Sequence, residues 1–346
     1  MSANLVLKKD NIFGDNIAEA SLYNFSRGNL NDTNRILNIT TVASICYQSP
    51  KAIGSESLYK RLLSESNGLP SSSFEFIPVL LTWQEVMDVC SLIETPIITK
   101  DNDGISISKI DTQTPEIEKY GQWIEELGCK YLLTNFRAIT FDYEKYGDRG
   151  VDLRKRYNTE YECDIIDKYY KVFRFKVDFP TRSQMVRHRV NLQELSRRYV
   201  SGKRVEVKHY LSKKLKKVVS KYKYQEVYQE FIPDDNFKFG SDLIQSVPGM
   251  IVKEVEIDLT TQNVIDICMN HYYKALEDGV KPQEARRIIP QTGYTEFWMG
   301  FLPFQLENFF KLRDDSHAQW EVRQCAIAMK EMLNIPLTVD EVKDEE

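Results

Sequence analysis

The sequence predicts an α/β (α+β) chain, because strand patterns and helical stripes both occur along its length. Residues 172–178 alternate apolar and polar side chains with a period of two, which indicates a strand, and residues 74–82 form a short apolar run of strand type. Residues 260–277 and 322–333 carry apolar side chains at helical spacing. The length of 346 residues allows one large domain or two ordinary ones.

The first quarter of the chain predicts two helices and a strand after a polar segment that lies on the surface. Asp32 or Thr33 can cap the first helix, and Pro78 places the strand at a sheet edge or at a bulge. In chain order these elements are the surface segment 1–33, the helices 32–46 and 55–63, and the strand 74–82.

Residues 83–168 are harder to place, because apolar pieces, charges and tyrosines are mixed along them. A turn is expected at 101–104 and a helix over 115–127. We interpret 83–168 as an inserted subdomain within a single domain that spans 1–346. After the strand over 172–178, Pro180 and Thr181 open an arginine-rich helix.

The last third of the chain is predicted to be mainly helical. Thr261 can cap the helix over 260–277, and Gly279 ends it. Further helices are expected from Lys281 to Pro290, from Pro303 onward and over 322–333, before an acidic tail at 340–346.

Composition excludes several classes of function. No apolar run approaches the roughly 20 residues that span a bilayer, and no signal sequence opens the chain, so we expect a cytoplasmic protein. The net charge of −5 argues against a general nucleic-acid coat. Six scattered cysteines without a CxxC pair and four histidines argue against a disulfide framework and against a metal site.

Two basic segments need their own interpretation. The run over 203–223 mixes lysines with tyrosines, which suits nucleic-acid binding but is more typical of a solvated helix face. Residues 182–198 hold five arginines, a histidine, a glutamate and two serines between apolar anchors. Clustered guanidinium groups suit phosphate and carboxylate oxygens, so this segment predicts either an anion site or a solvated amphipathic helix.

Three separated segments together resemble the flavin-dependent thymidylate synthases. The strongest match runs from Leu312 to Glu321 (LRDDSHAQWE), within a longer match that begins at Glu284. The second is Arg187-His188-Arg189 with Glu194, Ser196 and Arg198 downstream, and the third and weakest comprises 43–47, 54–56 and 74–75. The matches follow the family's order over about 35–80 and 170–335, and leave 83–168 without a counterpart.

Three departures concern the flavin and the nucleotide. The family places seven residues between Arg-His-Arg and the serine, whereas 190–195 supply six. Phe76 replaces the usual histidine, and Leu302-Pro303-Phe304 replaces an Asn-x-Arg, so polar flavin contacts are lost. Asn135-Phe136-Arg137 either substitutes for that Asn-x-Arg or forms a surface turn.

The resemblance implies a mixed sheet flanked by helices and a reaction in which dUMP is methylated at C5 to dTMP. Methylenetetrahydrofolate would give the carbon, NADPH the electrons, and FAD would carry them. No protein nucleophile is then required, so the protein must orient the ligands and stabilise developing charge. The resemblance also implies a homotetramer whose sites are shared between subunits.

The resemblance assigns roles to eleven side chains. Arg313 would activate the pyrimidine, although alone it could be a cation at a helix C-terminus. Glu194 would accept from flavin or sugar, hold the arginines, or form a surface ion pair. The implied substrate-binding residues are Gln184, Arg187, Glu194, Ser196, Arg198, Arg286 and Arg313, and the implied cofactor-binding residues are Arg187, His188, Arg189, Glu194, Asn308 and His317.

Two rival functions remain open. The shortened motif could reshape the base pocket, which would suit a flavin-dependent C5-hydroxymethylase or a methylase of another pyrimidine nucleotide. The lost polar positions could instead indicate a flavin-free relative that binds nucleotide or nucleic acid without catalysis.

Overall fold

The structure is a computed structural model that describes residues 5–64, 70–94, 98–101, 104–107, 114–146, 152–239 and 243–337. The chain forms two compact units. The large unit comprises Met1–His209 and Gln291–Glu346, and the small unit comprises Tyr210–Pro290. A single domain with an insertion at 83–168 stays a prediction.

The large unit is built on a five-stranded sheet, which confirms the α/β (α+β) class. Every strand pair in this sheet is antiparallel, so the expected mixed sheet is wrong in that respect. The chain leaves this sheet after the strand Lys171–Asp178 and re-enters it at the strand Tyr294–Phe301 at the same end, where the N–H of Phe179 donates to the oxygen of Gly293 at 3.1 Å. In spatial order the strands are β1 (Leu5–Asp10), β2 (Glu19–Tyr23), β8 (Lys171–Asp178), β12 (Tyr294–Phe301) and β9 (Asn191–Glu194). The expected surface segment 1–33 therefore contains two strands of the sheet.

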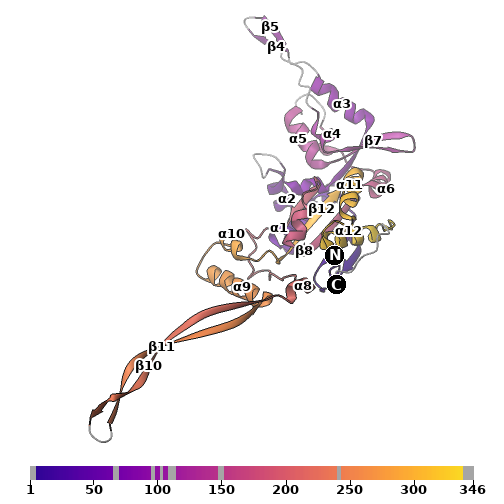
Figure 1. Ribbon diagram of the computed structural model, residues 1–346. Coiled ribbons are helices and arrows are strands. Elements are labelled where there is room, and N and C mark those ends of the chain that lie inside the picture. Colours follow the sequence, from indigo (N-terminus) through magenta and orange to yellow (C-terminus); the bar gives the residue numbers. More distant parts are fainter. Residues whose placement is uncertain are drawn as a thin grey trace. The chain divides into compact units, whose positions relative to one another are not determined.

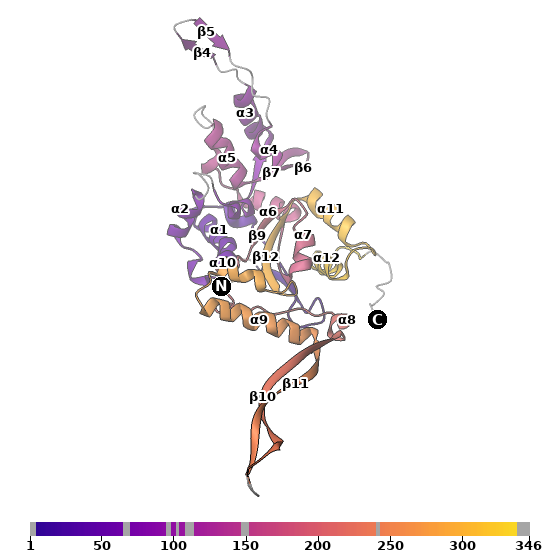
Figure 2. The same cartoon turned by 60° about the vertical axis from the view of Figure 1, so that its left-hand side comes forward.

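Both faces of this sheet are covered by helices, as Figures 1 and 2 show for the large unit. On one face Phe301 packs edge-on against Phe309 of α11 (Pro303–Arg313), and α12 (Trp320–Met332) contacts β1 and β2. On the other face Trp298 joins a core with Val42 and Ile45 of α1 (Asp32–Tyr47). The two C-terminal helices expected from Pro303 and over 322–333 are confirmed.

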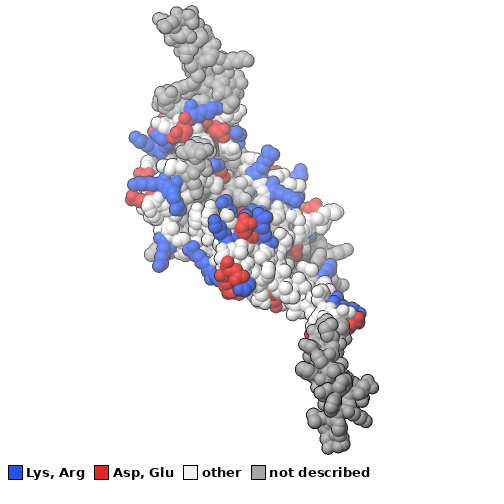
Figure 3. Space-filling model, turned by 90° about the vertical axis from the view of Figure 1, so that its left-hand side faces the viewer, with Lys and Arg blue, Asp and Glu red and all other residues white. Residues whose placement is uncertain are grey.

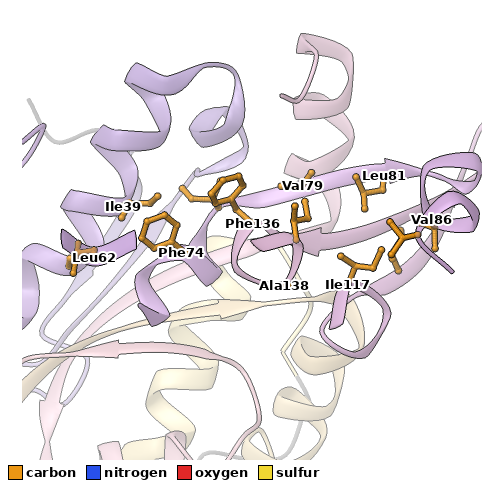
Figure 4. Close-up of a cluster of buried hydrophobic side chains, with 14 of the residues drawn as sticks. Ile39, Leu62, Phe74, Val79, Leu81, Val86, Ile117, Phe136 and Ala138 are labelled. Atoms are coloured by element: carbon orange, nitrogen blue, oxygen red, sulfur yellow. The ribbon is translucent and has the colours of Figure 1, made fainter. Parts of the chain in front are cut away.

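A second sheet lies beside the first helices in the large unit. Its strand order is β3 (Pro78–Thr82), β7 (Cys129–Asn135) and β6 (Gln122–Glu126), so Pro78 starts an edge strand as expected. Its core buries side chains of the first two helices and of residues 117–139, including the Ile39, Phe74 and Phe136 shown in Figure 4. The other elements around it are α2 (Glu56–Leu63), η3 (Ser72–Phe76), α3 (Trp83–Glu94), α4 (Glu116–Lys119), α5 (Phe136–Tyr146), η5 (Leu153–Lys155) and α6 (Glu160–Tyr169).

Two predicted helices are wrong. The helix over 115–127 is one turn followed by β6, because the segment pairs with β7 through a turn that has positive φ at Leu127 (52°) and Gly128 (78°). The arginine-rich helix ends at Met185 as α7 (Phe179–Met185), and residues 191–194 form β9 instead. The free edge of β12 offers those residues backbone partners that a longer helix would forgo.

The capping residues of two helices differ from the predicted ones and lie one residue or more earlier in the chain. The side chain of Asn31, rather than Asp32 or Thr33, caps α1 by accepting from the N–H of Asn34. Thr260 rather than Thr261 caps α9 (Thr261–Glu277). The strand expected over 74–82 begins at Pro78, after the 3₁₀ turn η3. The tail at 340–346 and part of the expected turn at 101–104 lie outside the described residues, although β4 (Ile98–Asp101) and β5 (Gly104–Ile107) flank that turn.

The small unit is a long β-hairpin joined to helices (Figure 2). Strands β10 (Val219–Phe239) and β11 (Leu243–Thr260) pair in antiparallel register from Val219 opposite Thr260 onward. The basic run over 203–223 is thus mostly not helical, because only α8 (Lys213–Lys216) is a helix there. The remaining elements are α9 (Thr261–Glu277), α10 (Pro282–Ala285) and η6 (Arg286–Ile288).

Candidate functional site

Arg313, the last residue of α11, is anchored to the chain that follows β8. Its Nε donates to Nε2 of His188 at 2.8 Å. Its Nη1 donates to the side-chain oxygen of Gln184 at 3.3 Å, and its Nη2 to the main-chain oxygen of Gln184 at 3.0 Å. A guanidinium has five N–H groups, so two remain for a ligand.

His188 is a neutral acceptor in this arrangement. Its side chain is 9% exposed, and its ring lies 4.8 Å from the ring of Phe309. Burial, and then the adjacent Arg313 guanidinium, lower the pKa of His188 to about 4. Since Nε2 accepts from Arg313, the proton of the neutral ring resides on Nδ1.

A short relay of amides holds Gln184 in turn. Nε2 of Gln184 donates to the side-chain oxygen of Gln319 at 2.6 Å, and Nε2 of Gln319 donates to Glu321 at 2.9 Å. Both partners come from the segment that leads into α12. The relay therefore fixes the Gln184 carbonyl toward Arg313.

The exposed cation Arg187 lies near the anchored arginine. Arg187 is near enough for its guanidinium to lower the pKa of Arg313 further, after the larger effect of burial. Arg187 and Arg189 are exposed, and within the described ranges no carboxylate forms an ion pair with either of them or with Arg313. Cations gathered without counter-charge favour binding of an anion.

Glu194 is already engaged by an arginine. Nε of Arg182 donates to Oε2 of Glu194 at 2.6 Å, and both side chains are partly exposed. This corresponds to the ion-pair alternative, on a strand rather than a helix, and it leaves the second carboxylate oxygen for a ligand. A ligand role for Glu194 stays a prediction.

Five other predicted residues are not joined to Arg313 by hydrogen bonds in the described structure. The main-chain N–H of Ser196 donates to Cys46 at 3.3 Å, and Arg198 is exposed over the ring of Tyr199. Asn308 is exposed on α11, and the exposed His317 ring pairs with Asp315 at 2.9 Å. Arg286 lies in the small unit, where its Nε donates to the oxygen of Gln283 at 3.3 Å.

The positions that depart from the family are mostly closed to a ligand. Phe76 is fully buried and Leu302 is 6% exposed, while Phe304 is exposed. Asn135-Phe136-Arg137 is not a surface turn, because Asn135 ends β7 and Phe136 is buried in the second core. Arg137 forms an ion pair with Glu75 at 2.5 Å, so its charge is used inside the fold.

Strand β9 is supported by residues to which the sequence had given no role. Nδ2 of Asn191 donates to the main-chain oxygen of Glu75 at 2.8 Å and to the hydroxyl of Tyr170 at 2.9 Å. Burial raises the pKa of Glu75, and the Arg137 guanidinium acts in the opposite direction. Gln319 and Phe309 were equally missed, although both lie inside the matched C-terminal segment, and that position was the available signal.

Surface features add two observations. None of the helices in the described part of the chain combines the length and apolar character that a membrane crossing needs. On the face shown in Figure 3, blue and red side chains are interspersed rather than gathered into one continuous basic stripe.

The fold is that of an α/β protein in which His188 and Gln184 hold the Arg313 guanidinium in a fixed orientation. Residues 165–335 match the model of the family described as "Thymidylate synthase complementing protein", so this part of the chain is similar to that family.

Similar proteins include three named flavin-dependent thymidylate synthase. That of Thermosipho melanesiensis is 37% identical over 109 residues, covering 30% of this chain and 47% of the relative. That of Thermotoga neapolitana is 33% identical over 107 residues, covering 31% and 46%. That of Aquifex aeolicus is 29% identical over 164 residues, covering 46% and 45%. The matches thus span about half the length of these relatives.

Two solved structures are also similar over part of the chain. They are crystal structures of a UMP/dUMP methylase PolB from Streptomyces cacaoi, one bound with 5-Br dUMP and one with 5-Br UMP. The first covers 47% of this chain and 65% of its own at 17% identity with a TM-score of 0.31. The second covers 47% and 68% at 19% identity with a TM-score of 0.30.

Proposed function

We propose that the chain is a flavin-dependent thymidylate synthase, a methyltransferase that converts dUMP to dTMP. Methylenetetrahydrofolate gives the carbon, and NADPH gives the electrons through FAD. The match to the family model over 165–335 and the names of the relatives support this activity. A cytoplasmic homotetramer with sites shared between subunits belongs to the same proposal.

The observation that carries the proposal is the anchored Arg313. Its two remaining N–H groups can meet a ring oxygen and N3 of a pyrimidine, where negative charge grows as C5 becomes nucleophilic. Donors fixed before the reaction stabilise that charge without a reorganisation cost, which raises the rate by lowering the activation barrier. Neutral His188 contributes by holding the guanidinium plane rather than by exchanging a proton.

The phosphate of dUMP needs charge-assisted donors. Arg187 and Arg198 are exposed and unpaired with carboxylates in the described residues, so both can supply them. Ser196 and Gln184 can add a hydroxyl and an amide, and Arg286 remains a third candidate cation from the small unit. Glu194 can accept from the sugar through the oxygen that Arg182 leaves open.

The exposed residues fit the diphosphate of FAD better than they fit its ring. Arg187 and Arg189 lack counter-charges in the described structure, as a diphosphate site requires. His188 cannot stack on the flavin ring while it packs on Phe309 at 9% exposure, which leaves its Nδ1–H as a donor. Asn308 and His317 are exposed and can contribute further polar contacts. When bound, FAD would supply the two-electron redox chemistry of the reaction.

The visible spectrum of the purified protein tests the proposal first. We expect a flavin absorbance band that bleaches when NADPH is added without oxygen, with and without dUMP. Mass analysis of the nucleotide product after addition of methylenetetrahydrofolate should then show a methyl group at C5.

Each rival has its own outcome in the same experiments. A hydroxymethyl product, or turnover of another pyrimidine nucleotide in place of dUMP, would favour the first rival. Failure to bind added FAD, with nucleotide binding retained, would exclude the synthase and leave the binding-only relative.

A further inference from the structure

A pocket that the proposed chemistry does not use lies where α1 ends and α2 begins. The two helices lie side by side in Figures 1 and 2, and the loop between them contributes lining residues to the pocket. Its volume is about 470 Å³, within the range of small-molecule sites. The lining residues are Tyr47, Ala52, Leu58, Arg61 and four serines at 44, 49, 55 and 57.

Arg61 gives the pocket a positive charge. It is exposed, and within the described ranges no carboxylate pairs with it. The nearest acid in its own helix, Glu56, is 3.8 Å from the ammonium of Lys60. The guanidinium carbon of Arg61 instead lies 5.7 Å from the ring centroid of Tyr47.

Tyr47 is part of a row in which two tyrosine rings lie between two arginines. Its ring lies 5.3 Å from that of Tyr199, and the guanidinium of Arg198 lies 5.3 Å from the Tyr199 ring. Tyr199 is 54% exposed. The row thus runs from the pocket to Arg198, the residue proposed to contact the nucleotide phosphate.

These groups select a ligand of one kind. Tyr47 and the apolar Ala52 and Leu58 suit a planar ring, which gains from stacking on an aromatic face. Arg61 and the serine hydroxyls suit an anionic group, because a guanidinium and hydroxyls donate together to phosphate or carboxylate oxygens. The Ser44 hydroxyl already donates to the main-chain oxygen of Thr41 at 2.7 Å, and the Ser55 and Ser57 hydroxyls share a hydrogen bond at 2.9 Å, so Arg61 is the main donor for an anion.

We infer that this pocket binds the anionic aromatic end of a cosubstrate. The inference rests on the proposed function, because both proposed cosubstrates carry such an end. NADPH ends in an adenosine 2′-phosphate, and methylenetetrahydrofolate in an aminobenzoyl-glutamate. The two fragments share a ring next to an anion but differ in which anion it is.

Calorimetric titration of the full chain with each fragment tests the inference. Adenosine 2′-monophosphate represents NADPH, and 4-aminobenzoyl-glutamate represents the folate. We expect one of them to bind, and Arg61→Ala to weaken that binding about 10-fold, the effect of losing a charge-assisted contact. Lys60→Ala, its exposed neighbour, is the matched control and should bind as the wild type does. Tyr47→Phe keeps the ring and should bind within about 2-fold.

Two results overturn the inference: neither fragment binds, or Arg61→Ala binds as tightly as Lys60→Ala. Flavin and dUMP titrations of the same proteins separate this failure from failure of the proposed function. A chain that binds a fragment through Arg61 but neither flavin nor dUMP keeps the pocket and loses the synthase.

Discussion

At Arg313, different neighbours set charge and geometry. Burial and the neighbouring positive charge of Arg187 lower the pKa of Arg313. A bound anion would offset this repulsion between the two guanidinium groups. Gln184 and His188 fix the direction of its N–H groups. A lysine keeps the charge but has no planar fork, so the two contributions can be separated by substitution.

Arg313→Lys should lower kcat/KM for dUMP about 100-fold, in the range for losing a preorganised donor. Thermal stability should change little, because Arg313 is only half-buried. Steady-state kinetics of the variant and of Lys311→Ala, an exposed cation on the same helix, check this. Equal losses in the two variants would show that the charge of α11, rather than the anchored fork, matters.

His188 should remain neutral through the pH range in which enzymes usually work. Its pKa is lowered from 6.5 to about 4, so the unfolded chain binds the extra proton first as pH falls. The stability that the neutral ring contributes is therefore complete above about pH 6.5 and is lost as pH falls toward 4. The pH dependence of kcat/KM between pH 5 and 8 should therefore be the same in the wild type and in His188→Gln.

Two variants at His188 test whether its ring nitrogen acts as the hydrogen-bond acceptor for Arg313. His188→Gln can still accept from Arg313 and should retain most activity, whereas His188→Phe cannot and should lose about 10-fold or more in kcat/KM. A Phe variant as active as the Gln variant would contradict the positioning role.

The sequence predicted the residues of the candidate site better than it predicted the contacts between them. Gln184, His188 and Arg313 were all candidates, and the structure brings these three together. The contact between His188 and Arg313 joins positions 125 apart in the chain, so no local pattern could predict it. Gln319 escaped because an amide in a helix-start segment has many ordinary roles.

At the scale of elements, β9 and β12 depend on a small residue. A Cβ at Gly300 would lie 3.0 Å from Cζ of Tyr170 and 3.3 Å from Cβ of Asn191, and still closer to the Tyr170 hydroxyl. That hydroxyl accepts from Asn191 and donates to the main-chain oxygen of Glu75. Gly300 thus permits the contact that ties η3 to β9.

Gly300→Ala should destabilise the fold by about 2 kcal/mol, a typical cost of overpacking. In a Tyr170→Phe background the same change should cost less, since the hydroxyl that it meets is gone. Thermal unfolding of the four proteins gives the coupling. Strict additivity would show that the glycine serves the strand for another reason.

Asp178 is the last residue of β8, and burial makes the ionised form of its carboxyl group unfavourable. Its Oδ1 is buried without a hydrogen-bond partner in the described structure, and burial raises its pKa from 3.8 to about 6. The folded state therefore binds the proton more tightly. The stability from this group is present below about pH 3.8 and is lost as pH rises through 6.

Asp178→Asn should consequently stabilise the protein at pH 7.5 by up to about 3 kcal/mol, the equivalent of roughly two pKa units. The gain should shrink as pH falls below 5, which denaturant unfolding at several pH values would reveal. A constant difference across pH would mean that packing, not charge, is responsible.

Elements with strong periodicity were predictable, and those decided by distant partners were not. The strand over 172–178 and the helix over 322–333 are confirmed because half-buried elements impose their period on the sequence. The helix over 115–127 failed because β7 offers that segment a sheet edge that lies outside any local window. The arginine-rich helix failed for the same reason at β12.

At the scale of the whole molecule, the two units differ in the size of their hydrophobic cores. Among described residues the small unit buries few apolar side chains, chiefly Ile265, Met269, Tyr272, Ala285 and Ile289, whereas the large unit holds two extensive clusters. A two-stranded ribbon adds little stability of its own. The antiparallel sheet and the second unit were beyond prediction, since both arise from chain reversals rather than from local pattern.

The small unit should therefore open before the large one. Hydrogen exchange followed by mass spectrometry should show amides of α9 exchanging well before those of β8 and β12. Mild denaturant should widen the difference. Equal protection of α9 and β8 would mean that the chain unfolds as one cooperative body.

The ion pair between Arg137 and Glu75 has an evolutionary consequence. Arg137 comes from 83–168, the stretch without a counterpart in the family pattern, and it neutralises a largely buried carboxylate whose main chain holds Asn191 of β9. A deletion of this stretch would leave the Glu75 carboxylate without its ion-pair partner and would weaken the support of β9, which carries Glu194. Descendants of this protein can therefore lose the segment only if another cation first replaces Arg137.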